Sequence, residues 1–148
     1  MANLFDPRRK EDTDTAHQWA LDQLYPRIFG AGYEIENVAY DKKNPDQRCH
    51  AFDCLLGVDS VVHLSIQKPY PERKMILTVQ ERFRDKKYQN YEDITITDGN
   101  NSTGNLSESS KLAAHLFLYG YVDKEQGCFT DAIAVNVEAM VSAIHKQQ

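Results

Sequence analysis

Two alternating segments joined by a proline-rich link constrain this chain more than any other feature. Residues 58–66 (VDSVVHLSI) are rich in β-branched side chains, and residues 75–84 (MILTVQERFR) alternate in the same way. The link between them carries two prolines, which lack the N–H groups that a β-ladder requires. We therefore predict that the two segments form a β-hairpin. Pairing about the middle of the link sets Asp59 opposite residues 81–83.

Glu81 lies on an otherwise apolar face of the second strand. The other members of that face are Met75, Leu77, Val79 and Phe83. A carboxylate in such surroundings needs a partner, a metal or a solvent-lined cleft. Asp59 is its expected neighbour, and two close carboxylates repel unless something positive lies between them. A divalent cation such as Mg²⁺ meets that need; the alternative is a pairing of Glu81 with Arg84 or with a helix residue at the sheet edge.

The remaining segments predict a single α/β domain over residues 13–148, preceded by a flexible terminus at 1–12. Helices are expected from Thr13 or Asp14 to about Tyr25, over 109–116, and after a cap at Asn136. Further strands are expected over 33–40, 91–97, 116–122 and 129–135, whereas 49–56 fits either a strand or a turn of helix. One mixed β-sheet with a central hairpin, flanked by helices, is the natural way to bury these faces.

Composition narrows the function classes. The chain of 148 residues has a net charge of −5, which argues against a surface coated in Lys and Arg for non-specific nucleic-acid binding. A local basic cluster does occur, in which Arg82, Arg84, Lys86 and Lys87 surround one acid; its alternative interpretation is a solvated turn. No apolar run is long enough to span a membrane and no export signal is present, so we expect a cytoplasmic protein with reduced thiols.

Other chemical motifs are incomplete. Cys49, His50 and Cys54 have the residue types of a zinc site, but a fourth ligand is not evident. Neither a glycine-rich phosphate loop nor a G-x-S-x-G nucleophile motif occurs.

The hairpin residues resemble the PD-(D/E)XK, or restriction endonuclease-like, nuclease superfamily. The match is Asp59 followed by Gln80-x-Arg82, or Asp59 with Glu81. The stretch TVQERFRDKKYQNYEDITIT and the later SKLAAHLFLYGYV also resemble phage-associated and bacterial proteins, so that the similarity covers residues 50–122.

The resemblance implies a mixed sheet flanked by helices and a hydrolase that cuts DNA with Mg²⁺ or Mn²⁺. Asp59 and Glu81 would hold the metal, the Gln80-Glu81-Arg82 run would form the catalytic segment, and Arg82 would stabilise developing charge. Arg84, Lys86 and Lys87 would contact the nucleic acid, and a homodimer is one assembly that such nucleases adopt.

One departure from the superfamily pattern leaves a second function open. The lysine expected two residues after Glu81 is replaced by Phe83, and Arg82 is always protonated and cannot act as a general base. Lys86, Lys87 or Lys111 would have to supply an amine from elsewhere. The alternatives are a catalytically degenerate module that binds nucleic acid or protein, for instance in phage–host conflict, and an assembly protein with no site.

Overall fold

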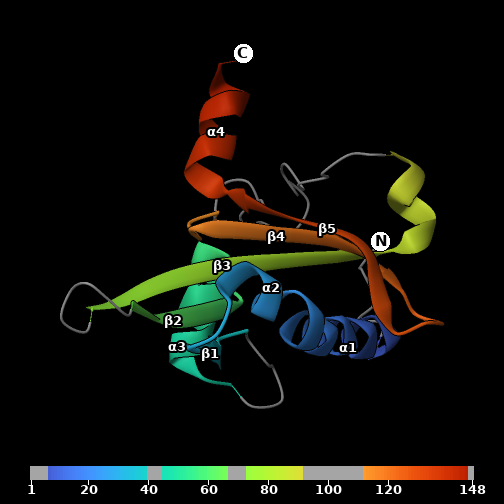
Figure 1. Cartoon of the computed structure of the whole chain (residues 1–148), viewed down its shortest axis with the longest axis horizontal. Coiled ribbons are helices and arrows are strands. Elements are labelled where there is room, and N and C mark those ends of the chain that lie inside the picture. The colour runs from blue at the N-terminus through green and yellow to red at the C-terminus, as the bar shows by residue number, and fades with distance from the viewer. Residues whose placement is uncertain (1–6, 40–44, 67–72, 92–111, 147–148) are drawn as a thin grey trace.

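The computed structural model describes residues 7–39, 45–66, 73–91 and 112–146. Helical segments and strands are interspersed along the chain (Figure 1). The helices are α1 (Pro7–Gln23), α2 (Tyr25–Phe29), α3 (Gln47–Cys49), η1 (His50–Leu55), η2 (Lys86–Tyr91) and α4 (Val137–His145). The strands are β1 (Tyr33–Asn37), β2 (Ser60–Ile66), β3 (Arg73–Asp85), β4 (Leu116–Asp123) and β5 (Cys128–Asn136).

The five strands form one mixed sheet in the order β1-β2-β3-β4-β5. β1, β2 and β3 are antiparallel neighbours, β4 runs parallel to β3, and β5 returns antiparallel to β4. The predicted hairpin is confirmed as β2 and β3, and β3 lies at the centre of the sheet. The coarse prediction of a single mixed sheet with helices is therefore confirmed.

The register of the hairpin differs from the prediction. Ser60 pairs with Val79, and the Asp59 amide donates to the Val79 carbonyl at 2.9 Å, so Asp59 lies beside Val79 and not opposite residues 81–83. β3 begins at Arg73, two residues earlier than predicted, and this moves the midpoint between the paired strands toward the N-terminus.

Two hydrophobic clusters occupy the two faces of the sheet. The first joins α1 and α2 to the sheet through Ala20, Leu24, Tyr25 and their strand partners, including Val79. The second packs Phe117 and other strand residues against α4. Figure 1 shows α1 and α2 lying together along the sheet, while α4 projects from it after β5. The face of β3 that carries Glu81 is therefore the face beneath the N-terminal helices.

Several predicted boundaries are wrong. α1 begins at Pro7, so residues 7–12 are helical and neither Thr13 nor Asp14 is the cap. Proline is well suited to a first helical turn, where its missing N–H costs nothing. Residues 49–55 are helical, which confirms the helical one of the two alternatives predicted for 49–56. The cap of α4 is confirmed, since Asn136 Oδ1 accepts a hydrogen bond from the Ala139 amide at 2.9 Å.

The predicted strand at 91–97 and helix at 109–116 fall largely outside the described residues, although Tyr91 ends η2 and residues 112–115 are not helical. No helix within the described ranges combines the length and apolar character needed to cross a membrane.

Candidate functional site

A cavity of about 740 Å³ opens beside α1, at the end of β3 and the start of η2. Asp59 and Glu81 both line it, together with His17 of α1 and Asn37 of β1. Five carboxylates line this cavity: Asp12, Asp14, Asp59, Glu81 and Asp85. Three permanent cations line it as well: Arg84, Lys87 and Lys124. Acidic side chains therefore outnumber permanently charged basic ones in the lining of the cavity.

Asp59 is fixed in place by its neighbouring strands. Its amide donates to the carbonyl of Val79 at 2.9 Å, and its carbonyl accepts from the amide of Val38 at 2.9 Å. Its side-chain Oδ2 accepts a hydrogen bond from the amide of Glu81 at 2.7 Å. Among the described residues, no donor is bonded to the second oxygen, Oδ1. The structure therefore brings the two predicted acids together through the backbone of one and the side chain of the other.

Glu81 is held by side chains from the helices above it. Its side chain is only 6% exposed. Oε2 lies 2.5 Å from Nδ1 of His17, and Oε1 accepts a hydrogen bond from the hydroxyl of Tyr25. The Ser60 hydroxyl lies at 3.5 Å from the same oxygen. Of the two protein partners that the sequence suggested for Glu81, the helix residue is the one found, although β3 is central and not a sheet edge.

The electrostatics of the cluster follow from this burial. Burial, reinforced by the charge of Glu81, raises the pKa of Asp59 to about 7, against the lowering effect of the Glu81 amide bond. The hydrogen bond to Glu81 raises the pKa of His17, with the charges of Glu81 and Asp59 adding to the effect. Burial also raises the pKa of Tyr25, which keeps its hydroxyl a donor to Glu81. The carboxylates of Glu81 and Asp59 thus both act on the same imidazole, that of His17.

The acid pair fits a loosely held divalent cation better than a closed metal cage. Among the described residues, no group of three or more His, Cys, Asp and Glu side chains is placed to hold a metal ion. Mg²⁺ is usually bound through one or two carboxylates, with water and phosphate oxygens completing its shell. Asp59 and Glu81 supply those two carboxylates, and Asp59 Oδ1 accepts no bond from the described residues. A cation at Glu81 would compete with the hydrogen bonds from His17 and Tyr25.

Gln80 and Arg82 lie on the opposite face of β3 from Glu81. Gln80 pairs with Phe117 of β4, whose side chain belongs to the cluster beneath α4. Gln80 is 7% exposed, and its Oε1 has no hydrogen-bond partner in the described part of the chain. The tripeptide Gln80-Glu81-Arg82 therefore contributes one residue to the cavity, since alternate strand residues face opposite ways.

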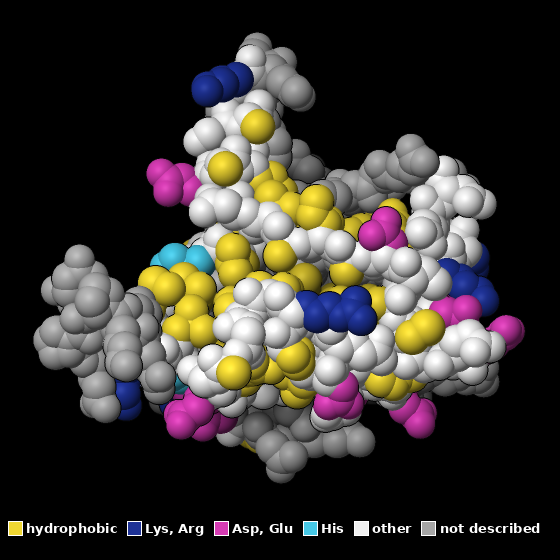
Figure 2. Space-filling model, viewed as in Figure 1, with side chains coloured by type: hydrophobic (Ala, Val, Ile, Leu, Met, Phe, Trp, Pro, Cys, Tyr) yellow, Lys and Arg dark blue, Asp and Glu magenta, His cyan; other side chains and the backbone are white. Residues whose placement is uncertain are grey.

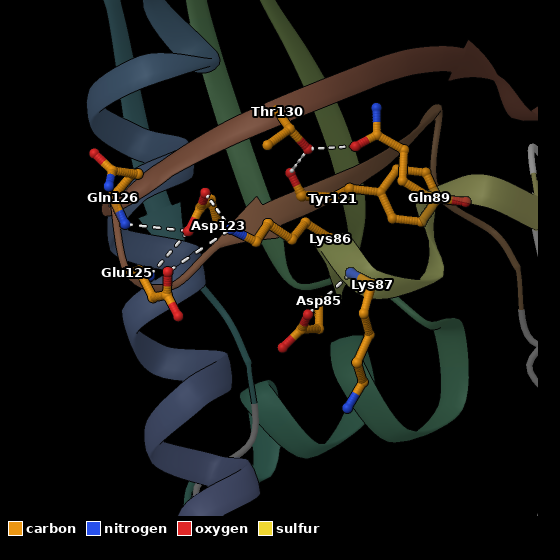
Figure 3. A network of polar contacts seen from close by, with 9 residues as sticks. All are labelled: Asp85, Lys86, Lys87, Gln89, Tyr121, Asp123, Glu125, Gln126 and Thr130. Atoms are coloured by element: carbon orange, nitrogen blue, oxygen red, sulfur yellow. Dashed lines mark hydrogen bonds and ion pairs between the residues drawn. The ribbon is translucent and has the colours of Figure 1, made fainter.

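The predicted nucleic-acid contacts divide into two groups. Arg84 and Lys87 line the cavity, whereas Lys86 turns away to Asp123, with Nζ 2.7 Å from Oδ2. Figure 3 shows Lys86 reaching toward Asp123 while Lys87 leaves the chain in another direction. Lys86 is thus engaged in an ion pair, and Lys111 lies outside the described residues.

A second cavity, of about 330 Å³, lies between α2 and β5 and has a different character. Leu24, Ile28, Leu118 and Phe129 are among its walls, and Arg27 and Asp131 are its charged residues. Figure 2 shows apolar side chains gathered over this part of the surface. Because it holds no pair of acids, this apolar cavity gives no support to the predicted chemistry.

Sequence reasoning missed His17 and Tyr25. A signal for His17 was present, because at helical spacing it falls on the stripe that carries Ala20 and Leu24. A polar residue on a buried stripe is a natural partner for an acid on an apolar strand face. The suggested zinc ligands Cys49 and Cys54 are partly buried thiols in the helical segment and form no disulfide. Comparisons of the chain with protein-family models, curated proteins and solved structures found no match.

Proposed function

We propose that this chain is a metal-dependent nuclease that hydrolyses DNA phosphodiester bonds in the 740 Å³ cavity. The observation that carries the proposal is the union of Asp59 and Glu81, joined by the 2.7 Å bond from the Glu81 amide to Asp59 Oδ2. The resemblance to the restriction endonuclease-like superfamily supports it, as do the mixed sheet and the placement of one acid directly before β2 and the other on its antiparallel neighbour β3.

Asp59 and Glu81 would hold Mg²⁺ or Mn²⁺. When bound, such an ion polarises the phosphate and lowers the pKa of the attacking water. Asp59 is fixed by three backbone hydrogen bonds, and His17 and Tyr25 orient Glu81. Preorganised ligands of this kind avoid the cost of ordering at the moment of reaction.

The cations of the cavity wall would receive the substrate. Arg84, Lys87 and Lys124 can contact phosphate oxygens, although Lys124 also forms an ion pair with Asp12. Of the two suggested replacement lysines that the structure describes, Lys86 and Lys87, it is Lys87 that lines the cavity. Phe83 cannot take that part, because its side chain carries no amine; its ring packs edge-on against Phe129 with centroids 4.9 Å apart.

The test is cleavage of supercoiled plasmid DNA with Mg²⁺, with Mn²⁺ and with EDTA. We expect cutting that requires the metal and falls by more than about a hundredfold in Glu81→Gln, since even outer-shell partners of metal sites are worth ~10- to 100-fold. Glu36→Gln is the matched control, because Glu36 is partly exposed, pairs with Arg48 at 2.6 Å and does not line the cavity. Equal cutting by Glu81→Gln and the control would refute the proposal.

A degenerate binding module is the second candidate function, and the observation that favours it is Phe83. The position where the superfamily carries lysine is filled by an aromatic ring that belongs to the apolar packing beneath the helices. A protein that binds DNA but neither binds Mn²⁺ nor cuts would establish this second function in place of the first.

A further inference from the structure

Tyr88 is an exposed aromatic ring flanked by two cations. It lies in η2, the short helix drawn in yellow-green after β3 in Figure 1. Lys87 Nζ lies 5.0 Å from the ring centroid and Arg84 Cζ lies 5.9 Å from it. Tyr88 nevertheless remains 42% exposed. The same three residues line the cavity that holds Asp59 and Glu81.

Another cation–aromatic pair in the chain shows what a packing role looks like. Arg48 lies over the ring of Phe52 at 5.7 Å, and Phe52 packs, partly buried, against the hydrophobic cluster beneath α4. Tyr88 belongs to neither hydrophobic cluster. Its ring therefore serves the described core little, while its position at the cavity leaves it available to a ligand.

The chemistry of this arrangement suits an unpaired nucleotide. Aromatic side chains stack on the bases of single strands, and neighbouring Lys and Arg contact the phosphates. Bases within a duplex are already stacked on each other and cannot reach an exposed ring. We propose that Tyr88, with Arg84 and Lys87, is a stacking platform for an unpaired base, so that the substrate class is single-stranded DNA or the single-stranded part of a longer DNA. The inference rests on the proposed function for the choice of DNA as the polymer.

Binding can be measured apart from cleavage. Fluorescence anisotropy of a labelled oligonucleotide of about 12 nucleotides, alone or annealed to its complement, is followed with the full chain in Ca²⁺ and in EDTA. We expect the single strand to bind more tightly than the duplex. We expect Tyr88→Ala to weaken that binding by about fivefold to a hundredfold, while Tyr88→Phe, which keeps the ring, binds as the native chain does.

A matched control separates stacking from charge. Arg48→Ala removes a cation from the other cation–aromatic pair, outside the cavity, and is expected to leave the affinity unchanged, whereas Lys87→Ala lowers it. Quenching of 2-aminopurine in the oligonucleotide, lost in Tyr88→Ala but kept in Tyr88→Phe, reports the stacking itself. Equal affinity for duplex and single strand, or full affinity in Tyr88→Ala, overturns the inference.

The two proposals fail separately. Glu81-dependent cutting of DNA together with unchanged oligonucleotide binding by Tyr88→Ala would remove the platform and keep the nuclease. Tyr88-dependent binding without cutting in Mg²⁺ or Mn²⁺ would keep the platform and remove the nuclease.

Discussion

Asp59 and Asp123 both lie next to strands of the sheet, yet their surroundings shift their pKa values in opposite directions. Asp123 accepts bonds from Lys86 Nζ at 2.7 Å and from the amides of Glu125 and Gln126 at 3.0 and 3.1 Å, as Figure 3 shows. These donors, Lys86 above all, lower the pKa of Asp123. Among the described residues, the side chain of Asp59 has a single donor, the Glu81 amide, and burial raises its pKa to about 7.

The contrast separates an acid whose charge is compensated by nearby donors from one that is buried with few donors. Asp123 closes the turn between β4 and β5, and the ammonium group of Lys86 compensates its charge. Asp59 lies in a cavity with Glu81, where two carboxylates share one neighbouring imidazole, that of His17. Perturbed groups in a cavity mark functional sites more often than compensated groups in turns do.

The largest expected effect that distinguishes the two aspartates is the pH dependence of stability in Asp59→Asn. Because the folded pKa of Asp59 is about 7 and the unfolded value is ~3.9, the folded state holds the extra proton between these values. The free energy of unfolding therefore falls as pH rises from about 4 to about 7.

Asp59→Asn removes this fall, by up to ~4 kcal/mol, since one pKa unit corresponds to ~1.4 kcal/mol. Urea unfolding at about pH 5 and about pH 8 measures the difference between the variant and the native chain. The account is contradicted if both proteins show the same pH dependence.

The second effect concerns the hydrogen bonds that hold Glu81. Tyr25 is fully buried, so Tyr25→Phe removes one bond to Glu81 while preserving the packing of the ring. We expect a loss of about 2 kcal/mol in the free energy of unfolding, because bonds to charged groups contribute ~1.5–3 kcal/mol. Tyr88→Phe, at an exposed ring, is the control and should change little. Equal stability of the two variants would show that the Tyr25 hydroxyl does not hold Glu81.

The smallest effect is expected at Asp123. Its lowered pKa means that it stabilises the fold above the unfolded pKa of ~3.9, and that this stabilisation is lost as pH falls through the folded value. Asp123→Asn should therefore be less stable than the native chain near neutral pH, by less than Tyr25→Phe, and should match it in acid. Lys86→Ala should reproduce part of the loss. A loss that grows toward low pH would reverse the sign and reject the assignment of Asp123 as a structural acid.

The sequence predicted the hairpin, the mixed sheet and the apolar face around Glu81, because alternation and proline placement act locally. It did not predict the register, because the register depends on where the link ends, and β3 begins at Arg73 and not at Met75. Neither did it predict that His17 and Tyr25 meet Glu81, because those contacts join residues 64 and 56 positions apart along the chain. The resemblance groups Gln80, Glu81 and Arg82 in one catalytic segment. Strand geometry, however, places the middle residue on the face opposite the other two.

We propose that Asp59 and Glu81 together hold a divalent cation. Titration of Mn²⁺, followed by the loss of its free-ion paramagnetic resonance signal, tests this without any substrate. We expect saturable binding of Mn²⁺ by the native chain and by Glu36→Gln. We expect this binding to weaken at least about tenfold in both Asp59→Asn and Glu81→Gln. Binding of equal strength in all four proteins, or no binding by the native chain, would contradict it.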